Sequence, residues 1–524
     1  MLTAMWVAPL AVALLLVPVT RREVLLGGWV GLAVLEVVLA VLAWSSVVPG
    51  GYAHEVSVPW IPAFGVGYHL GLDGISAPLV AMTTLVFLAV ALWSLRRDPA
   101  ADRDADERRA RAYVLLFLGL EAVSIGVFTA LDLVLFFVFF DVSIVLMYFV
   151  IAGWGSGERG RSALQFFLYT FVGSLVMLLG FLSLAVAAGG ASGATGDRVG
   201  ITFDIPALAA ADPLAGRGVA GMLTLAAIGI GLAIKTPVWP LHTWLPPAHT
   251  DAPAAGSAVL AAVLLKMGTY GFVRIALPLL PGPWRAAALV AVVLGVVSVL
   301  WGALLALAQR DLKRLVAYTS VNHMGYVLLA LGAAGYASAG SEARVLAVTG
   351  ATVQMVSHGV VTGALFLLAG TLRDRGGTSV VAAWSGLAGP MPRFSWTLAV
   401  AAFASLGLPG LSGFVAEFSM LAGSLPAVPV ATILAALGLA VTAGLFVRAL
   451  QSMLLGDRHL PAAADRPPAR TGMFRRPGSP DLRVGETAAV GLLLAASLAI
   501  GIAPALVTST IAPAAATVVD LVSR

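Results

Sequence analysis

The sequence predicts an all-α polytopic membrane protein of about 14 transmembrane helices, with two inverted five-helix repeats and two broken helices. The first observation is composition: of the 524 residues, 60% are hydrophobic and only 11% are charged. An ordinary soluble domain carries about 25% charged residues, so a soluble fold of this length could not cover its surface. The second is that apolar runs of the roughly 20 residues that cross a bilayer recur along the whole chain. Such runs form helices, because a backbone in lipid must satisfy its own hydrogen bonds.

The predicted helices divide the chain into five parts. Residues 1–112 hold the first three helices, 113–279 the first repeat, 284–455 the second repeat, 456–484 a cytoplasmic loop, and 485–524 the last helix and a tail. The individual helices are expected at 2–19, 24–46, 74–95, 113–130, 132–153, 163–188, 219–245, 253–279, 284–308, 315–336, 342–371, 395–425, 427–455 and 485–506.

The basic residues predict how the chain is oriented. Lys and Arg gather after the first, third, fifth, ninth, eleventh and thirteenth predicted helices, for example at Arg96, Arg97, Arg310 and Lys313. Because cytoplasmic loops carry an excess of Lys and Arg, these loops are expected on the inner side. The sequence therefore predicts a multi-pass protein of the bacterial cell (inner) membrane with both termini on the outer side. The net charge of +5 reflects this topology and does not indicate nucleic-acid binding.

Two of the predicted helices are interrupted. Residues 235–240 read Lys-Thr-Pro-Val-Trp-Pro, and because each proline lacks an N–H, the carbonyls of Ala233 and Thr236 lose their helical partners. Residues 407–413 read Gly-Leu-Pro-Gly-Leu-Ser-Gly, a flexible break in the twelfth helix. Broken helices in matching positions of two halves indicate an inverted-repeat transporter with its ion site at the breaks.

Ionisable residues fall inside the predicted helices, although a charge at the centre of a bilayer costs roughly 2.5–3.5 kcal/mol on insertion scales. A structural ion pair would account for any single one, and Glu36, outside the repeats, has no predicted function. A larger group in the central ten helices instead predicts a polar axis along the membrane plane that relays protons, since burial and opposite charges move the pKa values of such groups. Its members are Glu121, Asp141, Lys235, Lys266, His323, His358 and Glu417.

Metal and cofactor sites are not indicated in this chain. It has no cysteine, which excludes disulfides, cysteine-ligated iron–sulfur clusters and thiol catalysis. His242 and His249 flank a Trp-Leu-Pro-Pro segment near a membrane surface and are interpreted as structural residues. His323 and His358 lack a second histidine pair, so haem ligation is the weaker interpretation.

The segments around the first break resemble a known family. Residues 241–253, LHTWLPPAHTDAP, and 264–271, LLKMGTYG, closely resemble the antiporter-like subunits of respiratory complex I, which are related to subunits of multisubunit cation/proton antiporters. Further similarity lies at 68–76, 354–359 and 408–418. Glu417 is similar to the glutamate of subunit M, the counterpart of mitochondrial chain 4, at a position where subunits L and N typically have lysine.

The resemblance implies a role for each residue of the polar axis. Lys235 is similar to the central lysine of the first half-channel, and Asp141 stands where the family has the partner glutamate of that lysine. Gln165 stands where many members have lysine. The remaining implied roles are a connecting lysine for Lys266, relay histidines for His323 and His358, a terminal carboxylate for Glu417, and an acidic position of the fourth helix for Glu121.

The implied function is proton translocation within an NADH:quinone oxidoreductase, driven by quinone reduction elsewhere in the complex. The resemblance implies no redox centre in this chain: flavin, iron–sulfur clusters and bound quinone are expected in partner subunits. The expected surroundings are the lipid bilayer and the other membrane subunits, especially the antiporter-like L and N. Two alternatives remain open, a subunit of a cation/proton antiporter or of a membrane-bound hydrogenase, and a purely structural membrane scaffold.

Overall fold

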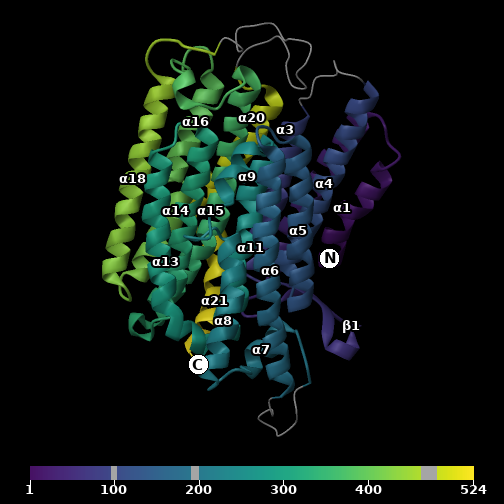
Figure 1. Ribbon diagram of the computed structural model, residues 1–524, viewed down its shortest axis with the longest axis vertical. Coiled ribbons are helices and arrows are strands. Elements are labelled where there is room, and N and C mark those ends of the chain that lie inside the picture. The colour runs from purple at the N-terminus through teal and green to yellow at the C-terminus, as the bar shows by residue number, and fades with distance from the viewer. Residues whose placement is uncertain (96–102, 191–199, 462–480, 524) are drawn as a thin grey trace.

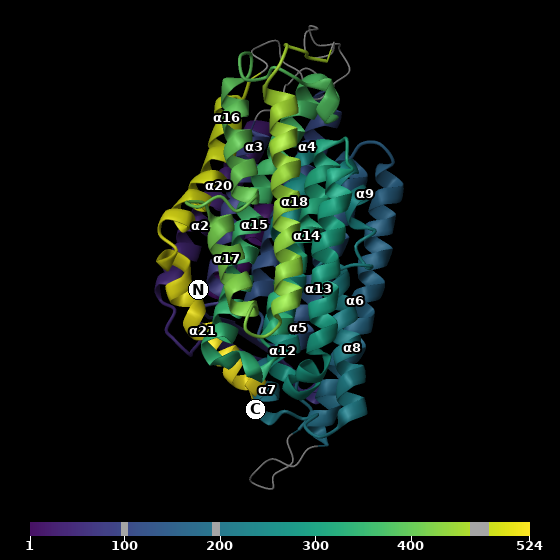
Figure 2. The same ribbon diagram turned by 90° about the vertical axis from the view of Figure 1, so that its left-hand side faces the viewer.

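The computed structural model describes residues 1–95, 103–190, 200–461 and 481–523. Most of them lie in long helices that stand roughly side by side, as Figures 1 and 2 show from two directions. Within the described ranges, 13 helices are long and apolar enough to cross a membrane. The predicted all-α membrane fold is therefore confirmed, with 13 candidate spans against the predicted number of about 14.

The helices follow the predicted order closely. The first half of the chain contains α1 (Leu2–Leu16), α2 (Arg22–Ser45), α3 (Ser76–Ser94), α4 (Arg103–Thr129), α5 (Leu133–Trp154), α6 (Arg159–Gly189), α7 (Ile205–Ala211), α8 (Gly218–Lys235), α9 (Leu245–Asp251), α10 (Ala254–Val259), η2 (Leu260–Leu264), α11 (Leu265–Gly271), η3 (Phe272–Ala276) and α12 (Leu277–Leu279). The second half contains α13 (Pro281–Leu307), α14 (Leu312–Ala333), α15 (Gly340–Gly376), α16 (Pro392–Ser405), α17 (Ser412–Ser424), α18 (Pro429–Leu454), α20 (Val484–Ile502) and α21 (Ala505–Ser523). Short 3₁₀ turns lie at η1 (Pro62–Phe64), η4 (Ala337–Ala339) and η5 (Val381–Ala383).

Both predicted helix breaks are present. The α8 helix ends at Lys235, and the chain passes through turns before α9 begins at Leu245. The carbonyl of Ala233, which cannot bond to Pro237, accepts a hydrogen bond from the Val238 N–H at 3.0 Å. The second break separates α16 from α17, where Gly407 and Gly410 have φ angles of 73° and 93°. These left-handed backbone conformations favour glycine, which explains the glycines of this segment.

The helix predicted at 253–279 is irregular in a way the sequence pattern does not reveal. The π-helical segments η2 and η3 flank α11, which carries Lys266 in its first turn. Such π turns occur mostly as isolated interruptions of α-helices and often at functional sites. The irregularity therefore surrounds one of the residues of the predicted polar axis.

Three further features differ from the predicted organisation. Strands β1 (Ala53–Ile61) and β2 (Val66–Leu72) pair as an antiparallel hairpin between the helices predicted at 24–46 and 74–95, with Ser57 opposite His69. The predicted tail after the last helix forms α21 instead, because Pro504 lies where α20 ends and a new helix begins. The first helix has only 15 residues, and in both views the N-terminal end lies about midway along the height of the molecule.

The most enclosed helices lie in the middle of the bundle. The segments 254–279, α14 and α15 are almost wholly buried by the helices around them. The hairpin, α7 and the C-terminal end lie at the lower end in Figure 1, and α16 begins at the upper end. Polar side chains on the enclosed helices are therefore shielded from lipid, which is where ionisable residues of membrane proteins are normally found.

Candidate functional site

Four of the seven predicted axis residues form one continuous chain of contacts across the enclosed helices. Lys266 of α11 places its Nζ 2.5 Å from Nδ1 of His358 on α15. The His358 ring lies edge-on to that of His323 on α14, with the ring centroids 5.3 Å apart. His323 Nδ1 lies 3.6 Å from the Oε1 atom of Glu417 on α17. This connected set, Lys266–His358–His323–Glu417, is called the relay chain below.

The first member of the relay chain is held by the irregular helix that carries it. Besides its contact with His358, the Lys266 ammonium group donates a hydrogen bond to the carbonyl of Ala261 at 2.6 Å. Ala261 lies in the π turn η2, five residues before Lys266. The lysine side chain is fully buried, so these two contacts replace the water that would otherwise solvate it.

The last member of the relay chain lies beside the second helix break. Glu417 and both histidines line a small cavity of about 10 Å³, close to the smallest space that holds one water molecule. Any side chain at Gly407 would collide with the Glu417 carboxylate, so a glycine is needed there for space as well as for its φ angle. The Oε1 atom of Glu417 is buried and has no hydrogen-bond donor, and it is therefore a candidate to receive a proton.

Two residues of this region were not singled out from the sequence. The Gln354 side chain hydrogen-bonds Nδ1 of His323 at 3.1 Å, and the Ser405 hydroxyl lies 3.3 Å from Nε2 of the same ring. Both ring nitrogens of His323 thus have a partner, which orients the ring between His358 and Glu417. Gln354 belongs to the segment 354–359 that carries the family resemblance, so its position there was the available signal.

Lys235 lies at the first break, and none of the described residues forms an ion pair with it. Its buried Nζ lies 3.5 Å from the Ser143 hydroxyl of α5 and 4.8 Å from the centre of the Phe140 ring, with Phe166 of α6 on another side at 5.8 Å. An ammonium group over aromatic rings is favourably placed by the cation–π interaction. The break also exposes the Ile234 carbonyl, which accepts a hydrogen bond from Trp244 at 2.9 Å.

Asp141 lies on α5, the helix that contacts this lysine, but does not itself contact the lysine. It stands one residue after Phe140 and two before Ser143, both of which contact Lys235. Among the described residues, Asp141 and Lys235 form no ion pair within 4 Å, and the Oδ1 atom of Asp141 is buried without a hydrogen-bond partner. An aspartate is one methylene shorter than the glutamate expected here. The shorter side chain is consistent with the absence of contact between the Asp141 carboxylate and the Lys235 ammonium group.

Glu121 lies apart from the relay chain. It is fully buried on α4, and neither carboxylate oxygen has a hydrogen-bond partner within the described ranges. The structure therefore brings together Lys266, His358, His323 and Glu417, places Lys235 and Asp141 near one another without contact, and separates Glu121 from both groups.

The two histidines interpreted as structural are indeed packed against aromatic rings. The His249 ring stacks on Phe366 with centroids 4.5 Å apart, and His242 lies edge-on to Tyr318 at 6.4 Å. Within the ranges that the structure describes, no group of three or more His, Asp or Glu side chains is arranged to hold a metal ion.

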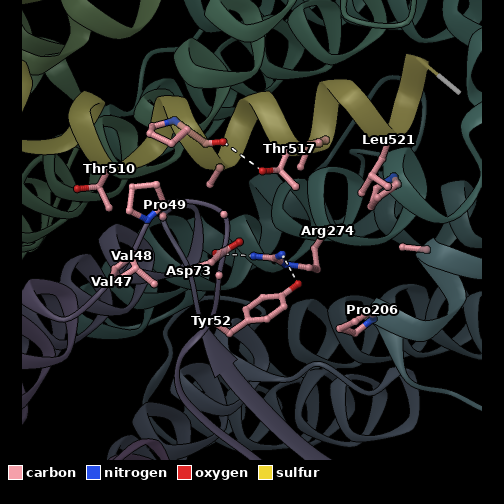
Figure 3. A pocket seen from close by; sticks show the side chains of 18 of the residues that line it. Val47, Val48, Pro49, Tyr52, Asp73, Pro206, Arg274, Thr510, Thr517 and Leu521 are labelled. Carbon is pink, nitrogen blue, oxygen red and sulfur yellow. Dashed lines mark hydrogen bonds and ion pairs between the residues drawn. The ribbon is translucent and has the colours of Figure 1, made fainter.

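A larger cavity of about 300 Å³ lies at the lower end of the molecule, between the segment before the hairpin, α7, α12 and α21. Figure 3 shows Arg274 reaching toward Asp73 and Tyr52 beneath α21. The guanidinium group pairs with Asp73 at 2.6 Å and donates to the Tyr270 hydroxyl at 3.0 Å. This ion pair joins the helix that carries Lys266 to the segment before α3, and it is separate from the relay chain.

A histidine of the hairpin connects it to the segment before α7. Nε2 of His69 on β2 lies 2.9 Å from a carboxylate oxygen of Glu55, and Nδ1 contacts the carboxylate of Asp204 just before α7. Burial lowers the pKa of His69, but the hydrogen bonds and negative charges of Asp204 and Glu55 outweigh it, so the pKa is raised.

Comparison with known proteins identifies the family to which these features belong. The family model described as NADH:quinone oxidoreductase/Mrp antiporter, TM, matches residues 130–443, which contain both breaks and the whole relay chain. The chain belongs to this family. The resemblance noted in the motifs is thereby confirmed.

Individual relatives agree with this assignment. Subunit M of the F(420)H(2) dehydrogenase of Methanosarcina mazei is 40% identical over 402 residues, or 76% of each chain. NADH-quinone oxidoreductase subunit M of Rhodobacter capsulatus is 39% identical over 470 residues, or 88% of this chain and 83% of the relative. The identification as a member of the subunit M branch is therefore confirmed.

Two solved structures share the fold. A chain of respiratory complex I from Thermus thermophilus, solved with bound NADH, superposes with a TM-score of 0.84 at 29% identity over the full length of both chains. A chain of the Mrp complex from Dietzia superposes with a TM-score of 0.83 at 24% identity, covering 99% of this chain and 97% of the other. At that identity the second likeness shows the fold alone.

Proposed function

We propose that this chain is the proton-translocating subunit M of an NADH:quinone oxidoreductase and moves protons along the buried path Asp141, Lys235, Lys266, His358, His323 and Glu417. The observation that carries the proposal is the relay chain. It joins a lysine, two histidines and a carboxylate from four different helices, and all four side chains are buried. The lysine lies 2.5 Å from the first histidine, the two histidine rings meet edge to face, and the second histidine lies 3.6 Å from the carboxylate. A structural role would not require four titratable groups in a row inside a membrane.

The chemistry of the relay chain suits proton transfer in a fixed order. A protonated Lys266 donates to Nδ1 of His358, and the other ring nitrogen, Nε2, is buried without a partner and is free to pass on a proton. His323 lies next along the path, and its Nδ1 faces the carboxylate of Glu417. Glu417 then releases the proton beside the helix break, where unwound backbone and water lower the cost of its charge.

The first half of the path needs water to connect its members. Lys235 and Lys266 lie on adjoining helices, since a side chain at Gly268 would touch Thr236 next to Lys235. No hydrogen bond joins the two lysines among the described residues. We assign the transfer between them, and between Asp141 and Lys235, to water that enters at the break after α8.

Glu121 is assigned to the flank of this path and not to its line of contacts. Its place on α4, next to α5 with Asp141, makes it a group whose charge influences the first half-channel. Because it has no contact with another member of the path, its contribution is electrostatic.

The cellular setting of the proposal follows the basic loops and the family. The neighbours are the L and N antiporter-like subunits, within a bacterial cell membrane. The basic loops face the cytoplasm, and both chain termini lie on the outer side. Flavin, iron–sulfur clusters and quinone are held by partner subunits, in keeping with the absence of cysteine from this sequence.

A second candidate differs in the electron donor. The relative from Methanosarcina mazei is a subunit M of an F(420)H(2) dehydrogenase, and its identity to this chain is as high as that of the NADH-dependent relative. The donor is bound by other subunits in either case, so the relay chain serves both enzymes equally. A cation/proton antiporter subunit is the less supported alternative, because the likeness to the chain of the Mrp complex shows the fold alone.

Purification of the native assembly tests the proposed function. A complex that contains flavin and iron–sulfur clusters and reduces quinone with NADH, while acidifying the lumen of inverted vesicles, is the expected result. Reduction with reduced F420 and not NADH would replace the first candidate with the second. A complex of antiporter subunits without redox centres, exchanging cations for protons, would contradict both.

A further inference from the structure

Two glutamates outside the relay chain are buried among the helices. Glu36 of α2 and Glu121 of α4 are both 0% exposed, and among the described residues none hydrogen-bonds any of their four carboxylate oxygens. Buried carboxylates elsewhere in this protein are treated differently: Asp73 pairs with Arg274, and Glu486 pairs with Arg375. The two glutamates are therefore not explained by ion pairing.

An aromatic contact nearer the N-terminal ends of α2 and α4 shows which faces of the two helices meet. Trp29 of α2 packs against Tyr113 and Phe117 of α4, with ring centroids 6.1 and 5.4 Å apart. Both helices run toward the hairpin: α2 leads into β1, and the Leu131 N–H just after α4 bonds to the His69 carbonyl of β2.

The same contact places the two carboxyl groups opposite each other. Glu36 lies seven residues after Trp29, and Glu121 lies eight residues after Tyr113 and four after Phe117. At 3.6 residues per turn, seven or eight residues are two full turns, so each glutamate occupies the same helix face as its aromatic residue. Two parallel helices in contact at the aromatic level thus bring Glu36 and Glu121 to one depth on facing surfaces.

Within the part of the chain that the structure describes, no ionisable group of the elements packed against this pair hydrogen-bonds either glutamate. The α1 and α3 helices contain no ionisable side chain. The elements α5, α11, β2 and α21 also contact α2 or α4, and none of their described ionisable groups hydrogen-bonds either glutamate. Those groups are Asp141, Tyr148, Lys266, Tyr270, Tyr68, His69 and Asp520. The N-terminal ends of α2 and α4, far from the pair, carry Arg22, Glu23, Arg108, Arg109 and Arg111.

We infer that Glu36 and Glu121 form a proton-binding pair in which the two carboxyl groups share one proton. Two carboxylates held together resist ionising at the same time, because each disfavours the negative charge of the other. A proton between them removes one charge and supplies the donor that the unpaired oxygens lack. The inference concerns a bound proton and holds whether or not protons move along the relay chain.

The pair lies within about one helical turn of the depth of Asp141. Across the α4–α5 contact, a side chain at Gly119 would touch Leu146 and one at Gly126 would touch Phe139. Glu121 lies between these two glycines on α4, and Asp141 lies between Phe139 and Leu146 on α5. On the proposed function, this places a bound proton beside the first half of the path.

Infrared difference spectroscopy of the whole complex in lipid vesicles tests the pair, because it reports the carbonyl stretch of protonated carboxyl groups as the pH is raised. The samples are the parent, Glu36→Gln, Glu121→Gln, the double variant, and Glu23→Gln as a control at an exposed glutamate of α2. Both single variants test the same coupling, so either one suffices if the other does not assemble.

The expected result is coupled titration. In the parent the two groups lose protons in separate steps, and in each single variant the upper step moves down by about one pH unit or more, because the neighbouring negative charge is gone. The double variant loses both steps, and Glu23→Gln titrates like the parent. An upper step that is unchanged in both single variants overturns the pair, as does displacement of the proton by Na⁺ at constant pH, which would make the site a sodium site. Neither outcome depends on pumping, so failure here is distinct from failure of the proposed function.

Discussion

The two halves of the buried path are built differently. In the second half, Lys266, His358, His323 and Glu417 follow one another at contact distances on α11, α15, α14 and α17. In the first half, Lys235 rests over the Phe140 ring and beside the Ser143 hydroxyl, with Asp141 nearby but not paired. Both halves contain a broken helix. Among the described residues, Glu417 beside the second break belongs to a continuous series of side-chain contacts, whereas Lys235 at the first break does not.

This difference separates transfer through side chains from transfer through water. Where side chains touch, each one is indispensable, because removing it leaves a gap that the enclosing apolar helices fill. Where side chains stand apart, water already bridges the gap, and it can partly bridge the one left by a truncated side chain. Substitutions should therefore have larger effects in the second half than in the first.

Lys266→Ala is expected to have the largest effect. It removes the side chain that hydrogen-bonds Nδ1 of His358, and proton transfer by a positioned group is worth about a hundredfold or more. Proton pumping per electron, measured in vesicles with the assembled complex, should fall by about that factor. Pumping within about a factor of two of the parent would show that the relay chain does not begin at Lys266.

Lys235→Ala should have a smaller but still strong effect, on the order of tenfold, because water at the break retains part of the connection. The comparison with Lys266→Ala in the same vesicle assay measures the difference between the halves directly. A loss as complete as that of Lys266→Ala would remove the distinction between transfer through side chains and through water.

Asp141 provides a graded change of reach at one position. Asp141→Glu extends the carboxylate by one methylene toward Lys235 and should keep or raise the pumping rate, whereas Asp141→Asn removes the charge and should lower it by several-fold, less than the lysine substitutions. Quinone-reductase turnover and pumping are measured together for both variants. A glutamate variant as impaired as the asparagine one would mean that Asp141 does not act through Lys235.

His69→Gln should leave pumping unchanged and alter only the pH dependence of stability. Because the contacts with Asp204 and Glu55 raise the pKa of His69 in the folded protein, protonation stabilises the fold. This stabilisation is fully present below the ordinary histidine pKa of about 6.5 and is lost as the pH rises through the raised value. Thermal unfolding of the complex should show the parent's advantage over the variant at acid pH and its loss at alkaline pH. An advantage independent of pH would mean that His69 acts by packing alone.

Some of this organisation could be predicted from the sequence, for physical reasons that are specific to each element. The breaks follow from Pro237 and from the glycines of 407–413, because missing N–H groups and left-handed φ angles act locally. The identity of the axis residues follows from the cost of burying charge, which marks Lys266 or Glu417 wherever the helices lie.

Other features depend on the packing of distant segments, which no local pattern specifies. The contact of His358 with both Lys266 and His323 joins residues of three helices, and helical periodicity does not say which helices adjoin. The π turns around α11 and the separation of Lys235 from Asp141 are likewise outcomes of packing. The pairing of Glu36 with Glu121 shows the same limit, since Glu36 alone had no interpretation until Trp29 fixed its partner helix.

The proton-to-electron ratio of Glu417→Gln tests the central claim most directly. Glutamine keeps the size and the hydrogen bonding of Glu417 but cannot titrate, and the exposed Glu342→Gln on α15 is the matched control. Measured in vesicles with the assembled complex, the account predicts that Glu417→Gln strongly lowers the ratio, that Glu417→Asp retains part of it, and that Glu342→Gln pumps normally. If Glu417→Gln pumps like the parent, protons do not leave through Glu417, and the relay chain is a structural feature.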